Sequence, residues 1–344
     1  MDFLYHYGLF LAQAVTIVVA IIAVIVGATV AASKPKSERG ELEIEDLGEY
    51  FAQVKEMLEE KVLTKEALKQ RQKAQKKAQK KEQKNADDAP QKPSLFVVEF
   101  EGSVDANEVS SLREEISAIL TIATSDDEVL LKIESGGGVV HGYGLAASQI
   151  SRLKAANIPI TVAIDKVAAS GGYMMACVAN NIICAPFAIV GSIGVVASLP
   201  NFNKLLKKND IDYEQFTAGD YKRTVTVFGE NDEKGRAKFN QELEETHTLF
   251  KTFVSENRPD LDIETVATGE HWFGTDAMKR GLVDELQTSD DYLMSKIDSH
   301  QLFGIKCVIK KSMAEKMGLS MSVAFDTVLG KWWQRSQRNR TNIG

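Results

Sequence analysis

The sequence predicts an α/β protein with a largely parallel sheet, joined to an N-terminal helix that crosses a membrane. Three observations support this class. Short apolar runs alternate with helical patterns between residues 94 and 290, twenty-five residues near the N-terminus carry no charge, and a strongly basic segment lies between these regions. The overall composition, 44% hydrophobic and 26% charged, is that of an ordinary globular core and excludes collagen-like, fully disordered and disulfide-stapled proteins.

The first element is the uncharged run over residues 8–32, which is long enough to cross a ~30 Å hydrocarbon layer as a helix. A cleaved signal peptide is the competing interpretation, with small residues at Val30-Ala31-Ala32 as the cleavage site. A signal peptide needs a basic start and an apolar core of roughly 7–15 residues, whereas residues 1–7 contain no Lys or Arg. We therefore expect a retained membrane anchor over residues 1–33.

Three basic residues, Lys34, Lys36 and Arg39, follow this span, and none precedes it. The positive-inside rule then places the C-terminal side of the span in the cytoplasm.

The second element, residues 34–93, is expected to be a charged spacer that is helical or disordered. Its first half has apolar residues at helical spacing, and residues 61–84 hold ten Lys and Arg against two Glu. Lysine-rich segments can bind nucleic acid or anionic lipid. A solvated spacer is favoured because no aromatic residue accompanies the charge, so we expect no nucleic-acid partner.

Residues 94–290 form the third element, a catalytic-type α/β domain. Strands alternating with helices indicate βαβ units on a parallel sheet, whose ligands lie beyond the carboxyl ends of the strands. The expected strands are Leu95–Phe100, Val129–Ile133, Ile158–Ile164 and Asn181–Ala185. The expected helices between them are Ala106–Ala123, Gly142–Ala155 and Ser170–Ala179. Residues 182–200 are too interrupted by Pro and Gly to be a second membrane span.

The loop after the second strand reads Glu134-Ser135-Gly136-Gly137-Gly138. Consecutive glycines allow close backbone approach, and their N–H groups could hold an anion or a developing oxyanion. A phosphate loop is excluded because no Gly-Lys-Ser/Thr follows. A plain tight turn remains open on this motif alone.

The third strand leads into Ala168-Ala169-Ser170-Gly171-Gly172, where a serine stands at a strand-to-helix junction. The segment differs from the G-x-S-x-G elbow because Ala168 occupies the first glycine position. Ser170 is either an exposed nucleophile or a helix N-cap. Candidate bases are His141, His271 and Lys222; the histidines lack a triad setting, and a lysine base must be held neutral by burial.

Several motifs in order resemble the S49 (signal peptide peptidase A) peptidase family over residues 94–290. They are the glycine loop, the Ala-Ser-Gly-Gly-Tyr turn, Val190-Gly191-Ser192-Ile193-Gly194-Val195, Ala218-Gly219-Asp220-Tyr221-Lys222, and the pattern from Thr268-Gly269-Glu270 to Gly281-Leu282-Val283-Asp284. The resemblance implies a ClpP/crotonase-like fold and a Ser-Lys dyad, with Ser170 as nucleophile and Lys222, 52 positions later, as general base and acid.

The resemblance also implies an oxyanion hole made by the backbone N–H groups of Gly138 and Gly171. The family usually has Ser-Pro-Gly-Gly where this chain has a glycine at Gly136, which makes the assignment at Gly138 less firm than the dyad. Family members assemble as rings in which Ser and Lys can come from neighbouring subunits. This chain has no internal repeat, so a homo-oligomer is expected.

The function expected is a membrane-anchored serine endopeptidase of the bacterial inner membrane, acting on signal peptide remnants or other apolar polypeptide segments. The alternatives are a catalytically silent membrane scaffold of the same fold and an acyl-CoA enzyme of the crotonase type. The charge rule places the catalytic domain in the cytoplasm, while the family analogy places it on the outer side.

No metal or organic cofactor is expected, and the cysteines Cys177, Cys184 and Cys307 have no metal spacing and are interpreted as buried free thiols. The last element, residues 291–344, is predicted as a C-terminal extension with a basic aromatic tail.

Overall fold

The computed structural model describes residues 6–11, 13, 16–17, 40–71, 73 and 92–309, and the chain divides into two compact units. Unit 2, Leu42–Cys307, holds the folded domain, and unit 1 comprises the two ends of the chain. Most of the predicted membrane helix, most of the basic segment and the tail from residue 310 lie outside the described residues. Within the described part of the chain, no helix is both long and apolar enough to cross a bilayer.

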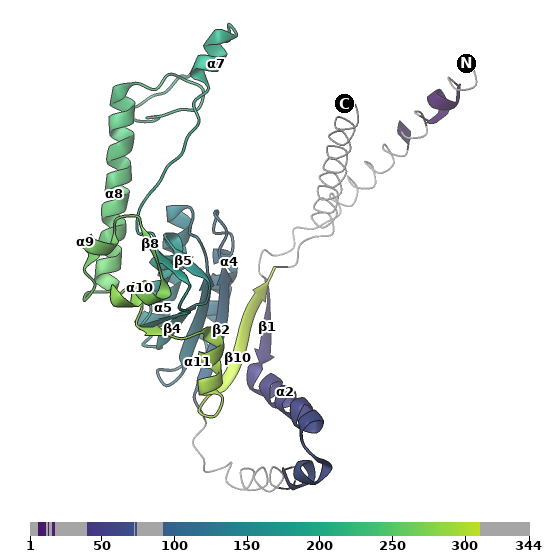
Figure 1. Ribbon diagram of the computed structural model, residues 1–344. Coiled ribbons are helices and arrows are strands. Elements are labelled where there is room, and N and C mark those ends of the chain that lie inside the picture. The colour runs from purple at the N-terminus through teal and green to yellow at the C-terminus, as the bar shows by residue number, and fades with distance from the viewer. Residues whose placement is uncertain are drawn as a thin grey trace, which may run out of the picture. The chain divides into compact units, whose positions relative to one another are not determined.

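The folded domain is an α/β structure built on a seven-stranded sheet, counted over the described residues, with the order β1-β10-β2-β3-β4-β6-β9 (Figure 1). From β10 to β9 every neighbouring pair is parallel. The strands are β1 (Glu41–Asp46), β2 (Ser94–Glu101), β3 (Glu128–Glu134), β4 (Ile160–Ile164), β6 (Asn181–Cys184), β9 (Glu285–Leu286) and β10 (Gln301–Val308). The expected α/β class with a parallel sheet is thus confirmed.

The four predicted strands correspond to β2, β3, β4 and β6, and all four lie side by side in the centre of the sheet. The edge neighbours β1 and β10 come from residues outside 94–290, so the sheet draws strands from the predicted spacer and from the predicted C-terminal extension as well. Residues 182–200 contain β6 and the short strand β7 (Ile189–Gly191) rather than a membrane span.

Both faces of the sheet are buried, which explains why the strand sequences are continuous apolar runs rather than alternating ones. Along β2, Phe96 and Val98 belong to a large core cluster, whereas Leu95 and Val97 belong to a second, smaller cluster on the opposite face. Helices α4 (Val109–Ile119), α5 (Val140–Ala155) and α6 (Gly171–Ala176) supply the large cluster, and α11 (Ser289–Lys296) supplies the smaller one.

A second, three-stranded sheet of β5 (Val167–Ala169), β7 and β8 (His271–Phe273) begins where β4 ends. Further helices are α2 (Leu47–Val62), α7 (Asn203–Lys208), α9 (Ile263–Val266) and α10 (Gly274–Lys279). The longest described helix is α8 (Glu233–Asn257), whose 25 residues span about 37 Å at 1.5 Å per residue.

Residues 196–231, called the arm here, join β7 to the N-terminal end of α8 and project with α7 away from the sheet (Figure 1). The arm is held together by its own contacts. Phe202 N–H donates to Val227 O at 2.7 Å, and the ring of Phe228 lies against those of Phe202 and Tyr213. The arm therefore forms a small structure of its own on α8.

Candidate active site

Ser170 stands between β5 and α6 in a backbone conformation that is rare for a residue with a side chain, with φ of +52° and ψ of −117°. Such a conformation costs about 1–3 kcal/mol and persists only where the surroundings hold it. Here the Ser170 N–H donates to Gly191 O at 2.8 Å, and the Ser170 carbonyl accepts from Met174 N–H at 2.9 Å. The neighbouring strand β7, which contains Gly191, and the helix after the serine thus fix the turn.

The N-cap interpretation of Ser170 is wrong. An N-cap serine has an extended backbone, and its side chain accepts a hydrogen bond from the first helical turn. Ser170 has a positive φ, and its side chain makes no capping hydrogen bond. The hydroxyl is half-buried and lines a cavity.

The glycine loop packs directly against this turn. Gly137 has φ of +87°, and a Cβ atom on it would lie 2.7 Å from Gly171 N. A Cβ atom on Gly138 would lie 2.0 Å from the carbonyl oxygen of Val104. Larger residues at these two positions would push the loop away from Ser170, so the glycines are a steric requirement of the site and not merely those of a flexible turn.

The cavity beside Ser170 has a volume of about 320 Å³. Ser170, Gly138 and Gly171 all line it, so the structure brings together the predicted nucleophile and both residues predicted to supply the oxyanion amides. Its other lining residues are mostly apolar or small: Val140, Gly144, Ser148, Met174, Gly194, Val195, Thr246, Leu249, Phe250 and Phe253.

The α8 side of the cavity was missed from the sequence, although a signal was present. Phe253 lies four residues after Leu249 and three after Phe250, which places its side chain beside both of theirs on one face of a helix. What the sequence could not indicate is that this face points at Ser170.

Of the described residues that line the cavity, none is titratable. His141 and His271 are both exposed and do not line it. Nucleophilic attack by a serine needs a base within hydrogen-bond reach. The described residues of one chain therefore place no candidate base in the cavity beside Ser170.

Lys222 is exposed on the arm and lines a different hollow, formed by other arm residues. The ring of its neighbour Tyr221 lies beneath the ammonium groups of Lys234 and Lys238, at 5.3 and 5.7 Å. Thr246, where α8 first meets the cavity, is eight residues beyond Lys238, or about 12 Å along the helix. The structure does not bring Lys222 to Ser170 within one chain.

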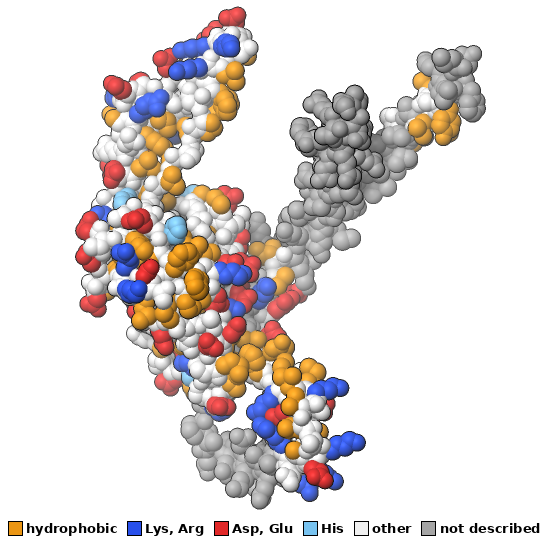
Figure 2. Space-filling view, in the orientation of Figure 1, with side chains coloured by type: hydrophobic (Ala, Val, Ile, Leu, Met, Phe, Trp, Pro, Cys, Tyr) orange, Lys and Arg blue, Asp and Glu red, His pale blue; other side chains and the backbone are white. Residues whose placement is uncertain are grey.

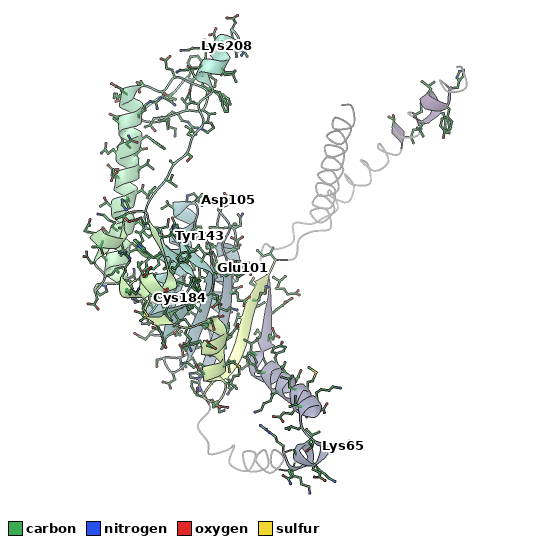
Figure 3. The ribbon with its side chains drawn as sticks, viewed as in Figure 1. Lys65, Glu101, Asp105, Tyr143, Cys184 and Lys208 are labelled. Atoms are coloured by element: carbon green, nitrogen blue, oxygen red, sulfur yellow. The ribbon has the colours of Figure 1, made fainter. Side chains whose placement is uncertain are left out.

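Figure 3 shows Lys208 at the far end of the arm and Tyr143, which packs against Gly171, inside the domain.

Two residues of the closing motif, Leu282 and Asp284, accept hydrogen bonds from other elements of the domain. The Asp284 carboxylate accepts two hydrogen bonds from Arg258, at 2.6 and 2.9 Å, and one from Ile182 N–H. Burial alone would raise the pKa of Asp284, but these hydrogen bonds outweigh it and hold the pKa below its usual range. Nearby, the Tyr173 hydroxyl of α6 donates to Leu282 O at 2.9 Å.

Cys177 and Cys184 are buried free thiols, as predicted, and Cys307 is buried as well. Burial raises the pKa of Cys177 to about 12 and that of Cys184 to about 11, so both stay protonated and unreactive at neutral pH. Across the described residues, no group of His, Cys, Asp and Glu is placed to hold a metal ion.

A strained serine at a strand-to-helix junction, with glycine-loop amides beside it, defines a hydrolase-type site on an α/β fold. Residues 2–150 match the model for the peptidase family S49 N-terminal region, and residues 152–302 match the model for peptidase family S49. The chain belongs to peptidase family S49 and is a protease of that family.

Among curated relatives, the chain is 51% identical over 347 residues to the "Probable protease SohB" of Haemophilus influenzae, covering 98% of each chain. It is 52% identical over 322 residues to the protein of the same description from Buchnera aphidicola subsp. Acyrthosiphon pisum, covering 94% of this chain and 95% of the relative. A solved structure of a membrane-bound stomatin-specific protease mutant with a substrate peptide is 12% identical, with a TM-score of 0.40 over 66% of this chain and 96% of that one.

Proposed function

We propose that the protein is a membrane-anchored serine endopeptidase in which Ser170 is the nucleophile and Lys222 is the general base. Ser170 Oγ attacks the peptide carbonyl while the lysine amine takes its proton. The resulting ammonium then protonates the leaving amine. When water hydrolyses the acyl-enzyme, the lysine amine takes a proton from the attacking water and the ammonium returns a proton to Ser170 Oγ. The chemistry needs no metal or organic cofactor.

The observation that carries this proposal is the shared cavity of Ser170, Gly138 and Gly171. Gly171 is the first residue of α6, and the first N–H groups of a helix have no partner within the helix. The Gly171 and Gly138 amides beside Ser170 are suited to hold the oxyanion of a tetrahedral intermediate, an interaction worth about 3–4 kcal/mol per donor.

We infer that the lysine comes from a second copy of the chain. The cavity holds no base of its own, while Lys222 is presented on an arm whose apolar side chains are unusually exposed (Figure 2). These exposed side chains are Val196, Leu199, Phe202, Leu205, Ile211, Tyr213, Phe216, Tyr221 and Phe228. A neighbouring copy would cover this surface and remove water from the lysine, which a lysine base requires.

The proposed substrate is an apolar polypeptide segment, such as a signal peptide remnant. No charged side chain lines the cavity among the described residues, and Leu249, Phe250 and Phe253 form an apolar wall. Burying one apolar substrate side chain there would contribute about 1.5–3 kcal/mol.

The proposed location is the bacterial inner membrane, with the uncharged run over residues 8–32 as the anchor. The basic residues after the run favour a cytoplasmic domain, and the family analogy favours the outer side. A reporter that is active on only one side of the membrane, fused after Gly344, distinguishes these two locations.

The dyad is tested by peptide cleavage with the wild type, Ser170→Ala, Lys222→Ala and an equal mixture of the two variants, all in the full chain. Each variant alone should be inactive. If the dyad forms between chains, the mixture should regain about a quarter of the wild-type activity by random pairing of subunits. Equal activity in all samples would overturn the dyad, and an inactive mixture would place it within one chain. An inactive wild type that a serine-directed probe does not label would favour the silent scaffold.

A further inference from the structure

Behind the glycine loop, three hydrogen bonds follow one another in one direction. The Gly137 N–H donates to Ser135 Oγ at 3.1 Å, Ser135 Oγ lies 2.5 Å from the Tyr143 hydroxyl, and that hydroxyl donates to Ser103 O at 2.8 Å. An amide nitrogen can only donate and a carbonyl oxygen can only accept. With the tyrosine proton on Ser103 O, the Ser135 hydroxyl donates to the tyrosine oxygen, which lies nearer to it than its other acceptor, Gly102 O, at 3.5 Å.

This chain of bonds is shielded from water. Tyr143 is fully buried, and Ser135 is 2% exposed. Burial raises the pKa of Tyr143, so its hydroxyl keeps the proton that the chain requires. Hydrogen bonds in such surroundings polarise one another, and breaking one leaves a buried polar group without a partner.

The far end of the chain is also fixed. The Glu108 carboxylate accepts hydrogen bonds from both the backbone N–H and the hydroxyl of Ser103, at 3.0 and 2.9 Å. One residue along, Val104 O accepts from Val139 N–H at 2.9 Å. The segment that accepts the hydrogen bond from Tyr143 is thus bonded to the start of α4 and to the start of α5.

Ser135 and Tyr143 touch both loops of the proposed oxyanion hole. The Ser135 carbonyl accepts from Ala169 N–H at 3.0 Å, next to Ser170. The Tyr143 ring lies under Gly171, because a Cβ atom on Gly171 would be 2.3 Å from the ring carbon Cγ. One tyrosine therefore supports the Gly171 amide with its ring and the glycine loop with its hydroxyl.

We propose that Tyr143 is a positioning residue that, through Ser135, holds the Gly137 amide and so aims the next amide, that of Gly138, at the oxyanion. Three successive glycines have wide conformational freedom, and no proline stiffens this loop. The hydrogen-bonded chain removes that freedom. This inference rests on the proposed function, because it assigns the Gly138 amide a role in that same site.

The test compares Tyr143→Phe with Tyr292→Phe in the full chain. Both remove the hydroxyl of a buried tyrosine, but the Tyr292 hydroxyl bonds to Glu128 and Thr161 and belongs to the other core cluster. Tyr143→Phe should lower kcat roughly tenfold with KM unchanged, less than the 10²–10³ for deleting an oxyanion donor outright. Tyr292→Phe should leave kcat unchanged.

Two further readouts separate positioning from general stability. Affinity for a peptide aldehyde, which forms a tetrahedral adduct with the serine, should fall with kcat in Tyr143→Phe. Hydrogen exchange at Gly137 N–H should quicken in Tyr143→Phe and in Ser135→Ala. The double variant should lose no more kcat than the single variant with the larger loss, because both residues belong to the same series of hydrogen bonds.

The inference is overturned if Tyr143→Phe keeps wild-type kcat and Gly137 exchange, or if Tyr292→Phe loses as much kcat. Failure of the proposed function has a different signature, namely equal cleavage by the wild type and Ser170→Ala. In that event, exchange at Gly137 would test only whether Tyr143 holds this amide: faster exchange would show that it does, and unchanged exchange would show that it does not.

Discussion

The Glu115 carboxylate of α4 accepts a hydrogen bond from the backbone N–H of Cys307 in β10, at 2.8 Å. Glu115 is 4% exposed, and it joins the helix to the strand that the sequence did not assign to the sheet. Burial raises the pKa of Glu115 to about 7, against the opposing effects of this hydrogen bond and of Lys306.

The raised pKa makes the folded protein less stable as the pH rises. Between pH 4.5 and 7 the folded state binds more protons at Glu115 than the unfolded state, so this residue lowers the free energy of unfolding by roughly 3 kcal/mol across that window. In Glu115→Gln this contribution should vanish. Urea unfolding at pH 4.5 and pH 8 measures how much the free energy of unfolding changes between these pH values. Glu114→Gln is the control and should show the same change as the wild type. An equal change in the wild type and in Glu115→Gln would contradict the prediction.

An added methyl group should leave activity unchanged at Gly136 and lower it strongly at the adjacent Gly137. Gly136 has open space around its Cβ position and no positive φ, whereas a Cβ atom on Gly137 would lie 2.7 Å from the Cβ atom of Ser170 at φ of +87°. We expect Gly136→Ala to keep full activity and to change stability by less than about 1 kcal/mol. Gly137→Ala should lower kcat at least about 100-fold because the loop amides are displaced. Steady-state kinetics of both variants checks this, and equal kcat values would count against the loop packing.

The Arg258–Asp284 ion pair should stabilise the domain far more than an exposed pair. Arg258 has a side-chain exposure of 14% and Asp284 of 34%, against 75% for Lys279 and 58% for Asp276 in a surface pair. Arg258→Leu leaves a partly buried carboxylate without its cation, so we expect a loss of about 2 kcal/mol after allowing for its one-third exposure. Lys279→Leu should cost about 0.5 kcal/mol or less. Urea denaturation compares them, and similar losses would refute the difference.

Leu249 should contribute to substrate preference through the cavity wall. Leu249→Asn should raise KM about tenfold for peptides with an apolar side chain next to the cleaved bond, since about 1.4 kcal/mol of apolar contact is lost. Peptides with a small side chain there should be affected less. Ile122→Asn changes an exposed apolar residue that does not line the cavity and should leave KM unaltered. An equal KM effect on both peptide classes would argue against this role.

Local patterns in the sequence determined the central sheet and the strand-to-helix turn that carries Ser170. Unbroken apolar runs of strand length indicate strands buried on both faces, and β2, β3, β4 and β6 follow them closely. Glycines beside Ser170 mark close backbone approach, which depends on residues adjacent in the chain or one strand apart. The fold class could therefore be predicted from these patterns, whereas the grouping of Ser170, Gly138 and Gly171 was implied by the resemblance to family S49.

Tertiary structure alone decided which distant segments meet. The three-residue strands β5, β7 and β8 are too short to show a period, and β10 joins the sheet through pairing with β2 that no local pattern encodes. The α8 wall of the cavity and the contact of Tyr143 with Ser135 likewise depend on the packing of separate elements. A spacing of 52 residues between Ser170 and Lys222 fixes no distance, because α6, β6, β7 and part of the arm lie between them in the chain. Sequence spacing constrains local geometry, whereas contacts between elements arise from packing.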